Sequence, residues 1–209
     1  MRFENRRADE LRPLRFTVGY CDYPAGSVLV ETGKTRVLCN ATVEERVPPY
    51  LNGTGKGWVT AEYAMLPAAT KERTRRDVQN LKLSPRSAEI QRLIGRSLRS
   101  VTNLYTLDGL TITVDCDVLQ ADGGTRTASI TGGYLALWLA CESLRKAGRL
   151  TENPLRGEVA AVSAGVVDGE VLLDLDYSED SRAEADFNMI MTANGDIVEL
   201  QGTGEARPF

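Results

Sequence analysis

The sequence predicts an α+β fold, a single domain over residues 1–209 in which mixed β-sheets pack against at least two helices. Three observations lead to this prediction. Runs rich in valine, isoleucine and threonine are separated by short turns that contain glycine or aspartate, as in β-hairpins. Two other segments carry apolar residues at intervals of three and four, which is typical of amphipathic helices. A chain of 209 residues is also long enough to bury one sizeable core.

The first third of the chain is predicted to consist of strands and loops. Residues 27–31 and 35–43 flank a Thr-Gly-Lys turn and are expected to pair as a hairpin. Residues 48–57 are rich in proline and glycine and indicate a loop, and residues 58–66 indicate a further strand. Residues 67–85 are polar and lack periodicity, so we expect a long surface loop there, and such loops often carry function.

Two helices are predicted in the middle of the chain, at residues 87–101 and 129–147, with a strand at residues 110–119 between them. Both helices have their apolar residues at helical spacing. In the first helix, three arginines share the opposite face and suit either RNA or a subunit interface. They are Arg92, Arg96 and Arg99.

The last third is predicted to form two hairpins. Residues 159–167 and 170–176 flank an Asp-Gly turn, which is a strong hairpin signal. Residues 187–192 and 196–201 flank an Ala-Asn-Gly turn. Together with the earlier segments, these hairpins give the α+β prediction its mixed sheets.

The composition excludes several function classes. The chain has no histidine, so it cannot use imidazole bases or histidine-dependent triads. Its 4 cysteines are far apart and form no CxxC pair, so we expect free buried thiols in a reducing compartment instead of a zinc site. No apolar run approaches the roughly 20 residues of a membrane span. The charged N-terminus lacks the apolar stretch of a secretory signal, and we expect a cytoplasmic protein with no membrane partner.

Charge is distributed unevenly along the chain. The formal net charge of −4 argues against a uniformly basic nucleic-acid-binding protein. Basic residues nevertheless dominate residues 71–99, whereas acidic residues dominate from residue 168 onwards. This asymmetry allows a basic track beside an acidic centre.

The most informative segment is residues 119–130, in which a strand ends at a Gly-Gly turn and a helix begins. Free N–H groups and the helix dipole favour an anion at such a point, and Gly124 lets the backbone approach it closely. Thr125 offers a hydroxyl, and Arg126 offers a planar fork suited to phosphate. Arg86, at the start of the first helix, is a second candidate anion ligand. The alternative for both arginines is an ordinary solvated surface position.

Two charged segments are further candidates. Residues 177–186 are acidic and follow a strand that carries Asp174 and Asp176 on one face. Clustered carboxylates can hold Mg²⁺ or protonate a leaving oxygen, although a polar loop with helix-capping aspartates is favoured from these residues alone. The basic loop at residues 71–76 suits contacts to RNA phosphates, and a solvated loop is equally consistent with it.

Taken together, these segments resemble the ribonuclease PH family, phosphorolytic 3′-exoribonucleases that finish the 3′ ends of tRNA. The resemblance covers almost the whole chain from about residue 12, and its long central motif is highly specific. The matching stretches are residues 57–63, 89–96, 115–130 and 202–203.

The resemblance implies a fold like the second domain of ribosomal protein S5 and a homohexamer built as a trimer of dimers. It implies an enzyme that removes 3′-terminal nucleotides from tRNA precursors and releases them as nucleoside diphosphates. Action on rRNA as well is left open. Inorganic phosphate is the co-substrate, Mg²⁺ assists, and the reverse addition of nucleotides is accessible.

The resemblance also implies roles for individual residues. Phosphate would be bound by Arg86, Gly124, Thr125 and Arg126. The essential carboxylates and metal ligands would be Asp180 and Asp186. The residues that hold tRNA would be Arg73 and Arg76.

Two departures from the family pattern affect these expectations. Ala68 stands where members often carry another arginine, which weakens the expected grip on RNA. Relatives continue for roughly thirty residues past the position of Phe209 as an expected helix, so an apolar face of the sheet would be uncovered. Two rival hypotheses are an RNA-binding ring subunit without activity and a metal-dependent hydrolase. Retention of the Gly-Gly-Thr-Arg turn argues against the first, and the lack of a dense ligand cluster argues against the second.

Overall fold

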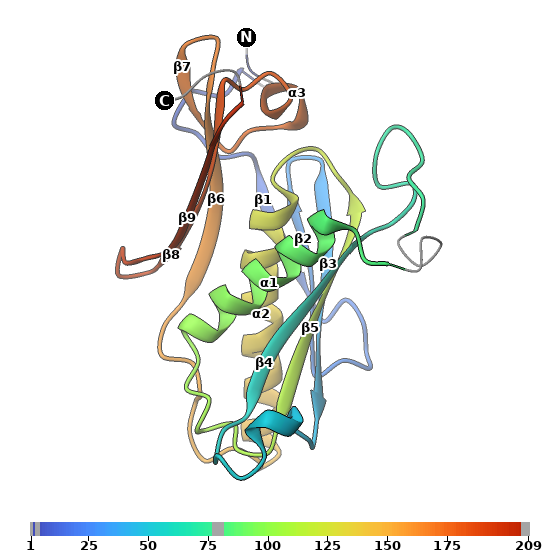
Figure 1. The fold of residues 1–209 in the computed structure, drawn as a ribbon, viewed down its shortest axis with the longest axis vertical. Helices are drawn as coiled ribbons and strands as arrows, with labels where there is room; N and C mark the ends of the chain where they lie inside the picture. The colour runs from blue at the N-terminus through green and yellow to red at the C-terminus, as the bar shows by residue number, and fades with distance from the viewer. Residues whose placement is uncertain (1, 3–4, 77–81, 206–209) are drawn as a thin grey trace.

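The computed structural model describes residues 2, 5–76 and 82–205, and it contains two β-sheets with helices between and beside them (Figure 1). The five-stranded sheet runs, in spatial order, β1 (Leu14–Val18), β2 (Gly26–Thr32), β3 (Thr35–Glu44), β5 (Thr111–Gln120) and β4 (Trp58–Met65). The four-stranded sheet runs β7 (Glu170–Leu173), β6 (Val159–Val167), β8 (Ala185–Thr192) and β9 (Ile197–Gly204). The helices are α1 (Pro85–Ser100), α2 (Thr125–Lys146) and the single turn α3 (Tyr177–Asp180), with a short 3₁₀ turn at Pro49–Leu51.

Helix α2 occupies the centre of the molecule. It packs on β2 and β3 of one sheet and on β6 of the other, while α1 covers β4 (Figure 1). Because α2 is enclosed from several sides, it is apolar nearly all round, whereas α1 has a distinct apolar stripe. Helix α1 begins where the sequence favours a helix, since Ser84 caps it and Pro85 occupies its first turn.

One hydrophobic core joins the two sheets. It contains Val30 and Cys39 from the five-stranded sheet, Ile130 and Leu137 from α2, and Ile190 from the four-stranded sheet. All of these side chains are fully buried. The relative position of the two sheets is therefore set by packing on α2.

The α+β prediction is confirmed, and so are the two central helices, the strand between them and the three hairpins. The second helix, however, begins at Thr125 and not at residue 129, because the helix follows directly from the glycine turn. Strand β7 ends at Leu173 and not at residue 176, since Asp174 adopts a left-handed backbone. Strand β1 and helix α3 were not predicted from the sequence.

The cysteines were expected to be free and buried, and Cys21 departs from this because it is only partly buried. All four are free, and Cys39, Cys116 and Cys141 are buried. None of the helices in the described ranges is long and apolar enough to cross a membrane.

The close contact between β2 and α2 requires a glycine at position 26. A Cβ atom there would lie 2.8 Å from the backbone nitrogen of Ala140 and would also collide with the carbonyl oxygen of Ala136. We expect Gly26→Ala to lower the free energy of unfolding by about 3 kcal/mol, because backbone atoms cannot yield as a flexible side chain can. Urea unfolding measures the change.

The matched control for this substitution is Gly157→Ala. No atom lies within 4 Å of a Cβ at Gly157, and its backbone is not left-handed. This variant is expected to stay within about 1 kcal/mol of the parent. Equal destabilisation by the two substitutions would contradict the packing argument.

Candidate functional site

A polar cleft of about 850 Å³ lies where the starts of α1 and α2 face β8, β9 and α3. It brings together six of the eight residues expected to form the site, although they come from four separate parts of the sequence. These six are Arg86, Gly124, Thr125, Arg126, Asp180 and Asp186. Arg73 and Arg76 lie in the loop after β4, outside this cleft.

The turn before α2 presents backbone N–H groups to the cleft. Gly123 and Gly124 both have a left-handed backbone, with φ of 79° and 66°. A Cβ at Gly123 would lie 2.6 Å from the carbonyl oxygen of Leu175, so this turn also needs glycine for space. No side chain caps the start of α2. Its first N–H groups are therefore available to an anion, as is usual where phosphate binds a helix N-terminus.

Two buried side chains hold the turn from behind. The Arg12 guanidinium donates to the carbonyl oxygen of Asp122 at 2.7 Å. The Thr35 hydroxyl donates to the carbonyl oxygen of Gly123 at 2.7 Å and accepts from the N–H of Asp122 at 2.9 Å. Arg12 is itself held by Asp174, through bonds of 2.6 and 3.0 Å to the two carboxylate oxygens. The backbone of the turn is thus fixed before any ligand arrives.

Thr125 is oriented by a buried tyrosine. The Tyr63 hydroxyl and the Thr125 hydroxyl are 2.8 Å apart, and Tyr63 is almost completely buried. Burial raises the pKa of Tyr63, whereas the hydrogen bond to Thr125 and the positive charges of Arg86 and Arg126 lower it. The pKa is raised on balance, so the phenol stays neutral and keeps its proton for hydrogen bonding.

Arg126 is held by a network that reaches across the cleft. Its guanidinium donates to Gln201 at 2.9 Å and lies 3.6 Å from the carboxylate of Glu89. The Gln201 amide in turn donates to Glu89 at 3.1 Å and to Glu199 at 3.2 Å. This network links α1, α2 and β9, and it holds Arg126 in the cleft that Gly124 also lines.

Asp180 and Asp186 line the same cleft as Arg86 and Arg126 and carry the opposite charge. The pKa of Asp180 is raised, mainly by burial and then by the negative charge of Asp186, although Arg86 and Arg126 act in the opposite direction. One carboxylate oxygen of Asp186 is buried without a hydrogen-bond partner among the described residues. An oxygen in this state requires a proton, a cation or a substrate group.

Asp174 and Asp176 have structural roles, and the helix-capping reading favoured from the sequence holds for Asp176. Asp174 forms the buried ion pair with Arg12, and Asp176 caps α3 by accepting from the N–H of Glu179. Burial acts to raise the pKa of Asp176, but hydrogen bonds from Ser178 and Glu179 outweigh it and lower this pKa. The described ranges contain no group of three or more acidic or cysteine side chains arranged to hold a metal ion.

The loop after β4 projects from the body of the molecule (Figure 1). Arg73 is exposed there, while Arg76 lines a second cleft of about 560 Å³ that shares Arg86 with the first. The floor of this cleft is acidic, with Glu62 and Asp115 side by side on β4 and β5. Burial, Glu62 and Asp117 raise the pKa of Asp115 to about 6.

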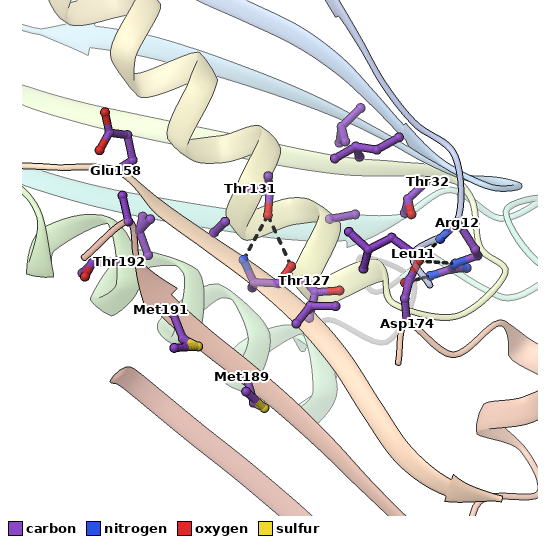
Figure 2. A pocket seen from close by; sticks show the side chains of 18 residues that line it. Leu11, Arg12, Thr32, Thr127, Thr131, Glu158, Asp174, Met189, Met191 and Thr192 are labelled. Carbon is purple, nitrogen blue, oxygen red and sulfur yellow. Dashed lines mark hydrogen bonds and ion pairs between the residues drawn. The ribbon is translucent and has the colours of Figure 1, made fainter. Parts of the chain in front are cut away.

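An apolar groove of about 350 Å³ lies between α2, β6, β8 and the segment before β1. Figure 2 shows Met189 and Met191 along this groove and the Arg12–Asp174 pair at one end. Within the groove, the Thr131 hydroxyl donates to the carbonyl oxygen of Ala161 at 3.5 Å and accepts from the N–H of Ala161 at 3.1 Å. The groove contributes packing surface and not chemistry, so the candidate site is the polar cleft.

The chain matches two models of one protein family. Residues 10–141 match domain 1 of the 3′ exoribonuclease family, and residues 157–209 match domain 2. The chain belongs to the 3′ exoribonuclease family. It is 56% identical to ribonuclease PH of Bacillus subtilis over 210 residues, covering 100% of this chain and 86% of that one. It is also 56% identical to ribonuclease PH of Crocosphaera subtropica, covering 99% of this chain and 85% of that one.

Solved structures share the fold of this family member. An Archaeoglobus fulgidus exosome with RNA bound to the active site aligns with a TM-score of 0.81 at 21% identity, covering 98% of this chain and 82% of that one. Rice Rrp46 aligns with a TM-score of 0.74 at 21% identity, covering 96% and 84% of the two chains. The two-sheet α+β architecture is therefore the architecture of the family.

Sequence reasoning did not find the residues whose hydrogen bonds hold the Gly-Gly turn, Thr125 and Arg126 in place in this exoribonuclease-family site. Arg12 lies in an irregular segment, and Tyr63 and Gln201 looked like ordinary strand residues. Strand alternation places Asp186 and Asn188 on one face, and this was the only available signal for Asn188.

We expect Asp174→Asn to lower the free energy of unfolding by about 3–5 kcal/mol, because it leaves the Arg12 charge buried without its partner. Asparagine tolerates the left-handed backbone at this position, so the change tests the charge alone. Asp168→Asn is the matched control, since Asp168 has the same backbone conformation but an exposed ion pair with Arg182. That variant should lose less than about 1 kcal/mol. Similar losses in urea unfolding would disprove a special role for the buried pair.

Asp115 provides a pH-dependent prediction. Its pKa of about 6 in the folded protein is above the ordinary value, so the folded form binds a proton more tightly than the unfolded form. The stability that this carboxyl contributes is present at low pH and is lost as the pH rises toward 6 and beyond. Asp115→Asn should therefore be more stable than the parent by roughly 1–2 kcal/mol at pH 8, after discounting for solvent screening, and by much less at pH 4.5. A pH-independent difference in urea unfolding would contradict this assignment.

Proposed function

We propose that this protein shortens RNA from its 3′ end by phosphorolysis, releasing one nucleoside diphosphate in each cycle. The observation that carries this proposal is the juxtaposition in one cleft of an anion-binding turn, two arginines and two carboxylates. A hydrolase would need a base to activate water. The arginines and the anion-binding turn support phosphorolysis instead, because they can hold a second anion beside the anionic RNA chain.

The chemistry follows from this arrangement. Phosphate bound by Arg86, Arg126 and the start of α2 attacks the phosphorus of the terminal phosphodiester. A new phosphorus–oxygen bond to phosphate forms, and the bond to the 3′ oxygen of the shortened chain breaks. The arginines and backbone N–H groups offset the repulsion between the two anions. The reverse reaction adds a nucleotide, because a phosphoanhydride is exchanged for a phosphodiester.

The leaving 3′ oxygen needs a proton, and Asp180 is suited to supply it. A carboxyl whose pKa is raised holds its proton more tightly than an ordinary one and can donate it as the bond breaks. Asp186 maintains this state because its negative charge raises the pKa of Asp180. We therefore assign acid chemistry to the pair, with Asp180 as the proton donor.

The two aspartates also fit Mg²⁺. Mg²⁺ is commonly held by one or two carboxylates together with water and substrate phosphates. The buried unpaired oxygen of Asp186 is the donor that such an ion would use, and Asp180 would join it as a second ligand only in its ionised form, after it has given up its proton. When bound, the ion would neutralise charge on the reacting phosphates.

We further propose that the RNA is the 3′ end of tRNA, as the resemblance to ribonuclease PH implies, and that the protein acts in the cytoplasm. Arg73 and Arg76 would contact the RNA backbone, since both lie in the projecting loop and carry mobile positive charge. The exposed edge strand β1 and the fold shared with exosome subunits are compatible with a homohexamer built as a trimer of dimers.

The proposal is tested with a tRNA that carries a short 3′ extension labelled at its terminal nucleotide. We expect release of labelled nucleoside diphosphate only when phosphate is added together with Mg²⁺. Release of a monophosphate without added phosphate would overturn the proposal and favour a hydrolase. Binding of the tRNA without any release would favour an RNA-binding subunit.

A variant pair links this activity to the cleft. Arg126→Met should raise the KM for phosphate by roughly 10- to 100-fold, because a charge-assisted contact to phosphate is lost. Arg145→Met changes an exposed arginine at the other end of α2 and should leave this KM unchanged. If the two variants have the same KM for phosphate, Arg126 does not bind it.

A further inference from the structure

Asn188 lies on β8 at the inner wall of the cleft, two residues after Asp186. Because alternate residues of a strand share a face, both side chains point into the same cleft, roughly 7 Å apart along the strand. On the neighbouring strand, Ser163 is the direct cross-strand partner of Asn188 and also lines the cleft. The reaction described above uses neither residue.

The Asn188 amide has no hydrogen-bond partner among the described residues. Its exposed fraction is 7%, and within the part of the chain that the structure describes neither end of the amide has a hydrogen-bond partner. The amide nitrogen and oxygen of Asn188 are not among the described buried atoms that lack a partner, so they are open to the cleft that the residue lines. A primary amide offers two donors and one acceptor there. Since Asn188 faces the cleft, a substrate group that enters there can satisfy these atoms.

Ser163 adds a further donor beside the amide. Its hydroxyl oxygen accepts from the N–H of Leu175 at 3.2 Å, and its exposed fraction is 6%. That bond occupies the oxygen as an acceptor and leaves the hydroxyl proton available. Together, Asn188 and Ser163 offer donors and an acceptor at neighbouring positions, which matches two adjacent hydroxyl groups.

The terminal ribose is the substrate group that has two adjacent hydroxyl groups. At the 3′ end of RNA, both the 2′ and the 3′ hydroxyls are free, whereas every internal ribose has its 3′ oxygen esterified. This ribose is the next group along the chain from the phosphorus under attack. Asn188 is likewise the next position along the cleft wall from Asp186. The base lies farther from the phosphorus, so the amide is better placed for the ribose.

We propose that Asn188, assisted by Ser163, binds the vicinal hydroxyls of the 3′-terminal ribose and thereby recognises a free RNA end. This proposal rests on the proposed phosphorolytic function and identifies how the same cleft selects its substrate. Asn188 is a specificity determinant, because it touches the substrate without taking part in bond cleavage.

The test compares oligoribonucleotides that differ only in the terminal sugar, which is ribose, 2′-deoxyribose or 3′-deoxyribose. For the parent enzyme, we expect kcat/KM for phosphorolysis to fall about tenfold when a bound hydroxyl is missing, the size of one lost hydrogen bond. Asn188→Ala should lower kcat/KM on ordinary RNA and leave little difference among the three ends. Asn188→Ser keeps a donor and an acceptor, and it should restore part of the discrimination.

The ratio between substrates separates recognition from a structural role. A variant that merely disturbs the fold lowers kcat/KM for all three ends equally, and this outcome would overturn the proposal. Discrimination that follows the identity of the terminal base would overturn it as well. Asn40→Ala is the matched control, because Asn40 lies on β3 and its amide oxygen accepts from Ser27 outside the cleft. Its discrimination should equal that of the parent.

A binding measurement tests the ribose subsite at Asn188 separately from the proposed phosphorolytic function. If the parent protein releases no diphosphate from ordinary RNA, phosphorolysis fails, and the dissociation constants of the same three oligonucleotides are measured instead. Tighter binding of the ribose end that is lost in Asn188→Ala supports recognition of the end by this subsite. Equal binding of all three ends by the parent overturns it.

Discussion

The buried ion pair between Arg12 and Asp174 is the interaction on which the site depends. It joins the segment before β1, the end of β7 and the turn before α2, which belong to distant parts of the chain. The pair is almost completely shielded from water, and its two hydrogen bonds match the fork of the guanidinium to the carboxylate. Such a pair has little net effect on stability compared with an apolar replacement, but it fixes geometry because breaking it is costly. Here the fixed geometry is that of the Gly-Gly turn.

A rigid turn matters because the cleft is assembled from opposing charges. Arg86 and Arg126 line the same cleft as Asp180 and Asp186, and the two arginines act to lower the pKa of Asp180, which burial and Asp186 raise. If the turn could relax, the arginines could pair directly with the aspartates and exclude phosphate. Gln201 works against such direct pairing, because its neutral amide oxygen accepts a hydrogen bond from Arg126. The amide nitrogen of Gln201 donates to Glu89 and Glu199. The network therefore orients a cation without neutralising it completely.

The sequence allowed the elements and the ligand groups to be predicted, but not the supports behind them. Periodicity identified α1 and α2, and the Gly-Gly-Thr-Arg segment indicated an anion site, because these signals are local in the chain. Arg12 and Asp174 are 162 positions apart, and no local pattern relates them. The resulting error was specific, since Asp174 was expected on a strand, whereas β7 ends at Leu173 and Asp174 has a left-handed backbone. Helix α3 was read as an acidic loop because four residues are too few to show a helical period.

The absence of histidine becomes understandable from this architecture. With phosphate as the nucleophile, the enzyme does not have to deprotonate water, so its remaining proton task is to protonate the leaving oxygen. A carboxyl with an ordinary pKa would be ionised at neutral pH and could not do this. Burial at the end of α3 and the neighbouring charge of Asp186 together raise the pKa of Asp180. The two arginines that we propose bind phosphate also limit this rise. On that proposal, the strength of phosphate binding and the acidity of the donor are set by one group of charges and cannot be changed independently.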